Sequence, residues 1–325
     1  MAQPAPTYRS WQPGIIALRP LNFGDFLTVP FKAMRFNRTV VLGGPLLFTI
    51  ITSVLTVAAG WVLFNDPRVG LMDAAPSFDG INTQTVILLV LAAVALFLAD
   101  VLCSSVVAPG VARAVLGERV TLGAALTQMR RRLGSLIGLY LVAGLVYVAL
   151  FAIALVPTFL GALFTDDGAA GAFVSFLLMT VLLIAAAVVV TLLQGVARAM
   201  IVLEGIGMGA AVKRVMRLIR GRFWWSILIV VVTGVLINIV ASTLSSVGQI
   251  AMLVAVAIAP ENVVVLAISF FLIFGLSFVI AMVATYAYMG AVYSLLYIDL
   301  RMRREGFDLD LARAAEARAA AQAGR

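Results

Sequence analysis

A short segment of this chain returns at nearly constant intervals. Residues 110–114, Gly-Val-Ala-Arg-Ala, are repeated unchanged at 195–199, and a weaker copy, Gly-Ala-Val-Tyr, occupies 290–293. The first copy is followed by Leu-Gly-Ala-Ala at 122–125 and the second by Met-Gly-Ala-Ala at 208–211. Echoes of this kind indicate one supersecondary unit used several times. The repeat predicts three units, with boundaries at 23–117, 122–205 and 208–305.

The repeated units are too apolar for a water-soluble core. Hydrophobic residues make up 63% of the chain and charged residues 12%, against about 45–50% and about 25% in soluble domains. Apolar runs longer than about 18 residues indicate membrane-spanning helices. Such runs cover 39–64, 85–116, 135–163, 171–203, 223–256 and 262–300. The sequence therefore predicts an all-α membrane protein whose six transmembrane helices form three hairpins in a pseudo-threefold repeat.

The distribution of charge predicts the orientation of these spans. Every Lys and Arg except Arg68 lies in the N-terminal arm, in the second and fourth loops, at the adjoining span ends or in the C-terminal tail. Basic residues stay on the cytoplasmic side of a membrane. We therefore expect a multi-pass protein of a bacterial inner (cytoplasmic) membrane with both termini cytoplasmic. Residues 1–22 then form an extended cytoplasmic arm, 23–306 the transmembrane domain and 307–325 a cytoplasmic tail.

A basic amphipathic helix is predicted at the start of each unit. In the third unit the apolar face is Val212, Val215, Met216 and Ile219, and the basic stripe is Lys213, Arg217 and Arg220. The apolar sets of the first two units are Phe23, Leu27, Phe31, Met34 and Leu122, Leu126, Met129, Leu133. Helices of this type lie in the cytoplasmic membrane interface. Their cations suit anionic lipid headgroups, and an acidic protein partner is the alternative.

Two small features accompany these helices. Gly123 and Gly209 are expected to let the chain turn sharply just before each helix. An acidic residue, Glu118, Glu204 or Asp299, follows each repeat glycine by eight or nine positions. One hypothesis is that each acidic residue pairs with the amphipathic helix of a neighbouring unit. The other is that these residues only balance charge on a basic surface.

Asp100 is the acidic residue in the middle of a predicted span. A carboxyl group at this depth is a candidate proton or cation site. Alternatively, it is neutral and hydrogen-bonded by Ser104, Asn238 or Ser242. Both interpretations remain open from the sequence.

Five basic residues are candidate contacts for lipid phosphates. A guanidinium group can hold a phosphate through two hydrogen bonds, and Arg113 and Arg198 lie near the predicted cytoplasmic ends of spans two and four. Snorkelling of these side chains toward the interface is the simpler alternative. Lys213, Arg217 and Arg220 of the third basic stripe complete the set.

Several functions have no support in the residues. Histidine is absent and Cys103 is the sole cysteine, which removes His-based catalysis, His metal sites and disulfides. No nucleotide-binding or metalloprotease motif is present. We therefore expect a non-enzymatic protein with no cofactor and no metal. The membrane explains the basic residues, so nucleic acid is not expected as a partner.

Three stretches carry a resemblance to a known family. They are residues 13–21, Pro-Gly-Ile-Ile-Ala-Leu-Arg-Pro-Leu, with Gly24 after them, residues 213–224, and residues 297–306, Tyr-Ile-Asp-Leu-Arg-Met-Arg-Arg-Glu-Gly. The chain resembles the actinobacterial glycerophosphoryl diester phosphodiesterase membrane-domain family over nearly its whole length. The resemblance implies a six-span membrane module. The enzyme of that name requires a soluble barrel with histidine and acidic metal ligands, so its activity is not implied here.

Together these observations favour a scaffold or lipid-interacting accessory module that works with partner proteins. The alternative is a secondary transporter or a transporter permease subunit, with Asp100 as the coupling carboxylate.

The predicted topology can be tested by chemical labelling. Cysteines introduced at Asp79 and Asp167 should react with an impermeant thiol reagent added outside intact cells. Cysteines at Arg131, Arg214 and Arg304 should stay unlabelled, because the basic loops face the cytoplasm. Labelling at Arg131 from outside would overturn the six-span topology.

Overall fold

The computed structural model describes residues 14–16, 19–64, 66–69, 80–164, 168–259, 273 and 275–306, and its regular elements within these ranges are helices. In order along the chain they are α1 (Phe23–Phe36), α2 (Arg38–Val41), α3 (Gly43–Phe64), α4 (Thr83–Val115), α5 (Leu122–Arg130), α6 (Leu133–Phe164), α7 (Gly168–Glu204), α8 (Met208–Ile219), α9 (Phe223–Ile258) and α11 (Gly275–Glu305).

Six helical segments are long and apolar enough to cross a membrane: Arg38–Leu63, Thr83–Val115, Leu133–Pro157, Phe173–Glu204, Phe223–Ile258 and Gly275–Glu305. The prediction of an all-helical chain with six candidate spans is therefore confirmed over the described residues. Much of the surface of these helices is apolar, with Leu145 and Phe173 among the exposed side chains. A helix forms its backbone hydrogen bonds internally. A helix with apolar side chains on its surface can therefore face lipid acyl chains.

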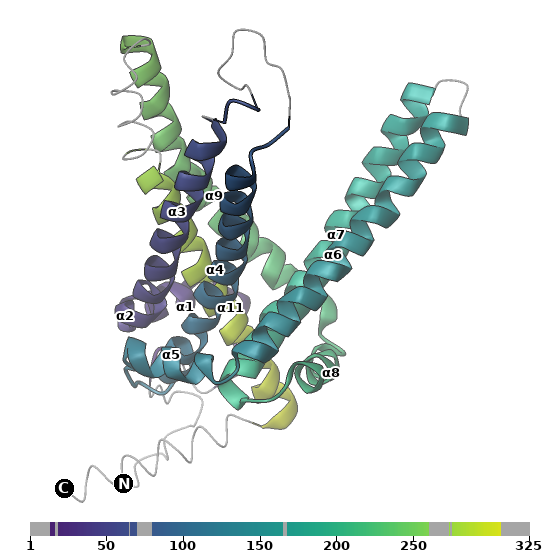
Figure 1. Ribbon diagram of the computed structural model, residues 1–325. Coiled ribbons are helices and arrows are strands. Elements are labelled where there is room, and N and C mark those ends of the chain that lie inside the picture. Colours follow the sequence, from purple (N-terminus) through teal and green to yellow (C-terminus); the bar gives the residue numbers. More distant parts are fainter. Residues whose placement is uncertain are drawn as a thin grey trace, which may run out of the picture. The chain divides into compact units, whose positions relative to one another are not determined.

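Contacts between residues divide the chain into two units, and the long helices α9 and α11 each contribute to both. The first unit comprises 1–28, 127–233 and 292–325, and the second comprises 29–126 and 234–291. Within the first unit, α6 and α7 pack side by side (Figure 1), and α8 packs against both. Within the second unit, α3 packs along α4, and the short α2 contacts both. In each unit, helices that are neighbours in the sequence are therefore also neighbours in space.

The three repeat glycines all lie where another helix approaches closely. In the first unit, a Cβ atom added to Gly195 of α7 would lie 2.6 Å from Cγ of Tyr293 in α11. In the second unit, one added to Gly110 would lie 3.0 Å from Cγ1 of Val40, and one added to Gly290 would lie 3.0 Å from Cβ of Val107. Small residues let membrane helices pack closely. The echo in the sequence thus marks helix contacts.

The glycines that turn the chain are different from those expected. Gly123 and Gly209 lie inside α5 and α8, so the prediction that they form turns before these helices is wrong. Positive φ angles occur instead at Gly117 (75°), Gly205 (69°) and Gly306 (63°). Gly117 is the second residue after the end of α4, and Gly205 and Gly306 directly follow α7 and α11. Glycine terminates helices in this way because it has no Cβ to clash in the left-handed region.

Asp66 organises the connection between α3 and α4. Its carboxylate accepts hydrogen bonds from the Thr85 hydroxyl (2.5 Å), the Asn82 amide (2.9 Å) and the Arg68 amide (3.0 Å). These bonds, the one from Thr85 first, lower the pKa of Asp66 below its ordinary value. The described residues do not include Asp73, Asp79, Asp166, Asp167 and Glu261 of the corresponding loops.

The close approach at Gly195 predicts a large effect from one methyl group. Gly195→Ala should lower the free energy of unfolding by about 1–3 kcal/mol, because the added Cβ overlaps the Tyr293 ring. Gly144→Ala in α6 is the matched control, since no atom lies within 4 Å of the position of its Cβ. Thermal unfolding in mild detergent, followed by circular dichroism, measures both. Equal stability of Gly195→Ala and the wild type would contradict the helix contact.

Candidate functional site

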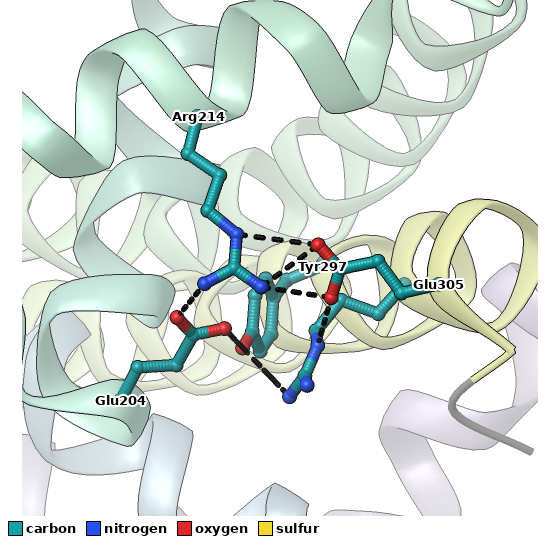
Figure 2. A network of polar contacts seen from close by, with 5 residues as sticks. Glu204, Arg214, Tyr297 and Glu305 are labelled. Atoms are coloured by element: carbon teal, nitrogen blue, oxygen red, sulfur yellow. Dashed lines mark hydrogen bonds and ion pairs between the residues drawn. The ribbon is translucent and has the colours of Figure 1, made fainter.

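A polar network joins the ends of α7 and α11 to the middle of α8 in the first unit. Figure 2 shows the Arg214 guanidinium of α8 between two carboxylates, Glu204 at the end of α7 and Glu305 at the end of α11. Its Nη2 donates to both oxygens of Glu305 at 2.8 Å, and its Nε donates to Oε1 at 3.2 Å. Nη1 donates to Oε2 of Glu204. Arg214 therefore connects three helices through one side chain.

Two further side chains of α11 close the network. The hydroxyl of the buried Tyr297 donates to Oε1 of Glu204. Arg301 lies one turn later, with Nε 2.9 Å from Oε2 of Glu305 and Nη1 3.7 Å from Oε1 of Glu204. Each carboxylate is thus shared between Arg214 and Arg301. Sharing of this kind fixes side-chain positions more firmly than an isolated surface pair does.

Partial burial makes these pairs stronger than exposed ones. The side chain of Arg214 is 27% exposed and that of Glu204 is 14% exposed. The hydrogen bonds to Glu305, with the nearby charge of Glu204, raise the pKa of Arg214 above its ordinary value. Arg214 is therefore held as a cation. Removing it would leave two carboxylates facing each other with one positive partner fewer.

The network sets which face of α8 points outward. Ala211, Val215, Leu218 and Ile219 are buried, whereas Lys213, Arg217 and Arg220 are exposed. Of the expected apolar face, Val215 and Ile219 are buried, but Met216 is 55% exposed. The buried stripe is thus rotated from the expected one, because Arg214 must reach the acidic ends of α7 and α11.

The three recurring acidic residues have different partners. Glu204 pairs with Arg214 of the following amphipathic segment, as one hypothesis expected. Glu118 instead pairs with Arg113, near the end of the preceding helix α4, at 2.7 Å. Asp299 accepts from Nε of Arg303, one turn later on α11, at 2.9 Å. The hypothesis of pairing with a neighbouring amphipathic helix therefore describes Glu204. The ion pairs of Glu118 with Arg113 and of Asp299 with Arg303 are local.

Asp299 also binds the N-terminal arm. Its Oδ1 accepts from the Leu21 amide at 2.8 Å, and Nη2 of Arg303 donates to the Leu21 carbonyl at 2.9 Å. Asp299 is buried, and so are Ile15, Ile16 and Leu21. The described part of the arm, expected to be extended, is therefore hydrogen-bonded to α11 through the main chain of Leu21, and its apolar side chains are buried. Residues 307–325 lie outside the described residues.

The two arginines of the repeated segment lie in different environments. Arg113 is exposed at the end of α4. Arg198 is 7% exposed; its Nη1 donates to the Tyr140 hydroxyl at 2.6 Å, and its guanidinium stacks on the Tyr293 ring at 5.4 Å. This burial disagrees with the expected contact between Arg198 and a lipid phosphate. The residue serves helix packing instead, because Tyr140 and Tyr293 enclose its charged end.

The residues expected around Asp100 are only partly brought together. Asp100 is half-buried on α4, and Ser104 donates to its main-chain carbonyl, one helical turn earlier. Ser242 donates to the Ile239 carbonyl of its own helix at 2.9 Å. Asn238 and Ser242 are exposed on α9. Ser104 and Ser242 thus each bond to a main-chain carbonyl of their own helix, as Ser and Thr often do within helices.

The candidate site residues predicted from the sequence do not include Tyr297, Arg301 and Glu305. A signal was present, since these residues recur every four positions and so share one face of a helix. The sequence does not show that Glu204 and Arg214 meet that face. Comparison of the chain with protein families, with curated proteins and with solved structures gives no match.

Arg214 should be the residue of α8 most important for stability. Arg214→Gln should lower the free energy of unfolding by about 1–3 kcal/mol, because two half-buried carboxylates lose their shared donor. Arg217→Gln, on the exposed side of the same helix, should change it by less than about 0.5 kcal/mol. Thermal unfolding in detergent compares the two variants. If both variants unfold at the same temperature, the network does not hold α8.

Proposed function

We propose that this chain is a non-enzymatic, multi-pass protein of a bacterial cytoplasmic membrane that binds anionic lipids and acts as a scaffold or accessory for partner proteins. The observation that carries the proposal is the orientation of α8. Its apolar side is buried, Arg214 is bound by Glu204 and Glu305, and Lys213, Arg217 and Arg220 face outward. A helix held in this way presents a fixed row of cations.

The proposal places α8 and its counterparts in the membrane interface on the cytoplasmic side. α8 directly precedes α9, whose apolar segment begins at Phe223, so its cations lie close to one end of a candidate span. Cations at this level attract anionic headgroups by about 1 kcal/mol each. With this orientation both termini are cytoplasmic, in agreement with the predominance of basic residues in the corresponding loops.

We also propose that the domain consists of three hairpins in a pseudo-threefold repeat, each introduced by an amphipathic helix. Two observations support this arrangement. Gly110, Gly195 and Gly290 all lie at close helix contacts. Gly117, Gly205 and Gly306 all adopt positive φ just after the ends of α4, α7 and α11. The resemblance to the phosphodiesterase membrane-domain family fits a module of this kind without a catalytic domain.

Charge reversal on α8 tests the lipid-binding function. Arg217→Glu should reduce the binding of phosphatidylglycerol measured by native mass spectrometry in mild detergent, and the difference should diminish as salt is added. Arg68→Glu is a matched control, because Arg68 is an exposed residue between α3 and α4. Replacing Lys213, Arg217 and Arg220 together should give a larger loss. Unchanged lipid binding in the triple variant would refute the proposed anchoring.

A further inference from the structure

The turn between α8 and α9 forms a small hollow on the surface of the first unit. The residues that line it are consecutive: Gly221, Arg222, Phe223, Trp224 and Trp225. This segment joins the end of the basic stripe to the first turn of α9, which is a candidate span. A ligand in the hollow would therefore lie where the chain enters the apolar layer. Trp224 is 80% exposed at this point, a position typical of tryptophans at the headgroup level.

One wall of the hollow is an arginine stacked on a tryptophan. The guanidinium of Arg222 lies 5.5 Å from the centre of the Trp225 ring. Phe23 of α1 packs against the same ring at 6.0 Å in an edge-on geometry. The Trp225 ring thus has a contact on two sides. Its Nε1 is buried and has no hydrogen-bond partner among the residues that the structure describes. An indole nitrogen of this kind is a donor that usually finds an acceptor.

A second arginine, Arg304 of α11, lies beside Gly221, the first residue of the hollow. Nη2 of Arg304 lies 2.8 Å from the position that a Cβ atom of Gly221 would occupy. Gly221 has a φ angle of 95°, a region that residues with side chains rarely adopt. Glycine therefore serves two purposes here, because it allows the turn and leaves room for the Arg304 guanidinium. Arg222 and Arg304 consequently flank the same residue from separate elements.

The two arginines differ from most others of this unit in their partners. Within the described part of the chain, neither Arg222 nor Arg304 forms an ion pair, in contrast to Arg214, Arg301 and Arg303. An anion bound by both guanidinium groups would offset the repulsion between them. A phosphate is the anion that guanidinium groups hold best, through paired hydrogen bonds. The N-terminus of α9 adds partial positive charge at the same place.

We propose that this turn is a discrete binding site for the phosphate of an anionic membrane lipid, with Arg222 and Arg304 as its ligands and Trp224 in the headgroup layer. The inference rests on the proposed lipid-binding function and makes it specific. The exposed stripe of α8 attracts headgroups in general, whereas the Gly221 turn holds one of them. The exposed face of Trp224 suits a ligand that carries an acyl chain beside its phosphate.

Replacement of a single charge distinguishes the site from the stripe. Arg304→Gln removes a charge whose side chain has no hydrogen bond or ion pair within the described residues, so folding should not change. Arg220→Gln is the matched control, since Arg220 is exposed nearby at the end of the α8 stripe. Native mass spectrometry of the full chain in mild detergent, titrated with phosphatidylglycerol, measures the affinity for the first bound lipid. Arg304→Gln should weaken this affinity about tenfold, and Arg220→Gln by less than about threefold.

The outcomes separate the site from the general function. Equal affinity in the wild type and in Arg304→Gln, with a loss on charge reversal of α8, overturns the site and leaves lipid anchoring intact. No loss in any of these variants overturns both proposals. Inorganic phosphate at millimolar concentration tests whether the ligand is a soluble phosphate or a lipid. If it displaces the first lipid, or raises the unfolding temperature as much as phosphatidylglycerol does, then the ligand is a soluble phosphate and the assignment to lipid is wrong.

Retention of the fold is checked independently. Arg222→Lys keeps the charge and the aliphatic stem beside Trp225 but loses the planar pair of donors. It should unfold at the temperature of the wild type and still bind the first lipid several-fold more weakly. Wild-type affinity in this variant would show that only charge matters, which contradicts a site built on guanidinium geometry.

Discussion

Close contact between helices at residues without side chains is the constraint on which the packing of both units depends. Apolar side chains gain little by leaving lipid for the surface of another helix, so helices in a membrane associate through van der Waals contact over short distances. Gly195 lets α7 approach Tyr293, and Gly290 lets α11 approach Val107. Larger residues at these positions would separate the backbones and lose that contact. The repeated segment of the sequence is therefore a repeated packing surface.

Polar contacts near the helix ends add to the close packing at the glycines. Arg214 lies between Glu204 and Glu305, so the ends of α7 and α11 determine how α8 is turned about its axis. Asp299 and Arg303 bind the main chain of Leu21 in the same unit. Charged groups can be used here because the helix ends lie at the polar boundary of the apolar segments. In the middle of the spans the polar contacts are uncharged: Ser242 and Thr243 bond to their own helix, and Tyr147 of α6 bonds to Thr191 of α7.

The consequence for function is a division of the arginines into two classes. Arg198, Arg214, Arg301 and Arg303 are bound to protein groups and serve the structure. Arg217, Arg220, Arg222 and Arg304 have no ion pair within the described residues. The proposed function and the proposed phosphate site both rest on this second class. The composition shows only that the chain is basic, and it does not distinguish the two classes of arginine.

The sequence by itself determined the helical class, the six candidate spans and the recurrence of one glycine-containing segment. These features follow from local composition and from periodicity, which do not depend on how distant segments meet. Only the tertiary structure decided that Arg198 is enclosed by Tyr140 and Tyr293, that Met216 is exposed, and that Leu21 binds Asp299. Whether a charge is free or bound depends on which residues from other segments come within about 3 Å of it. That information lies in the packing of helices, and a chain of nearly uniform apolar spans offers few local signals from which to predict it.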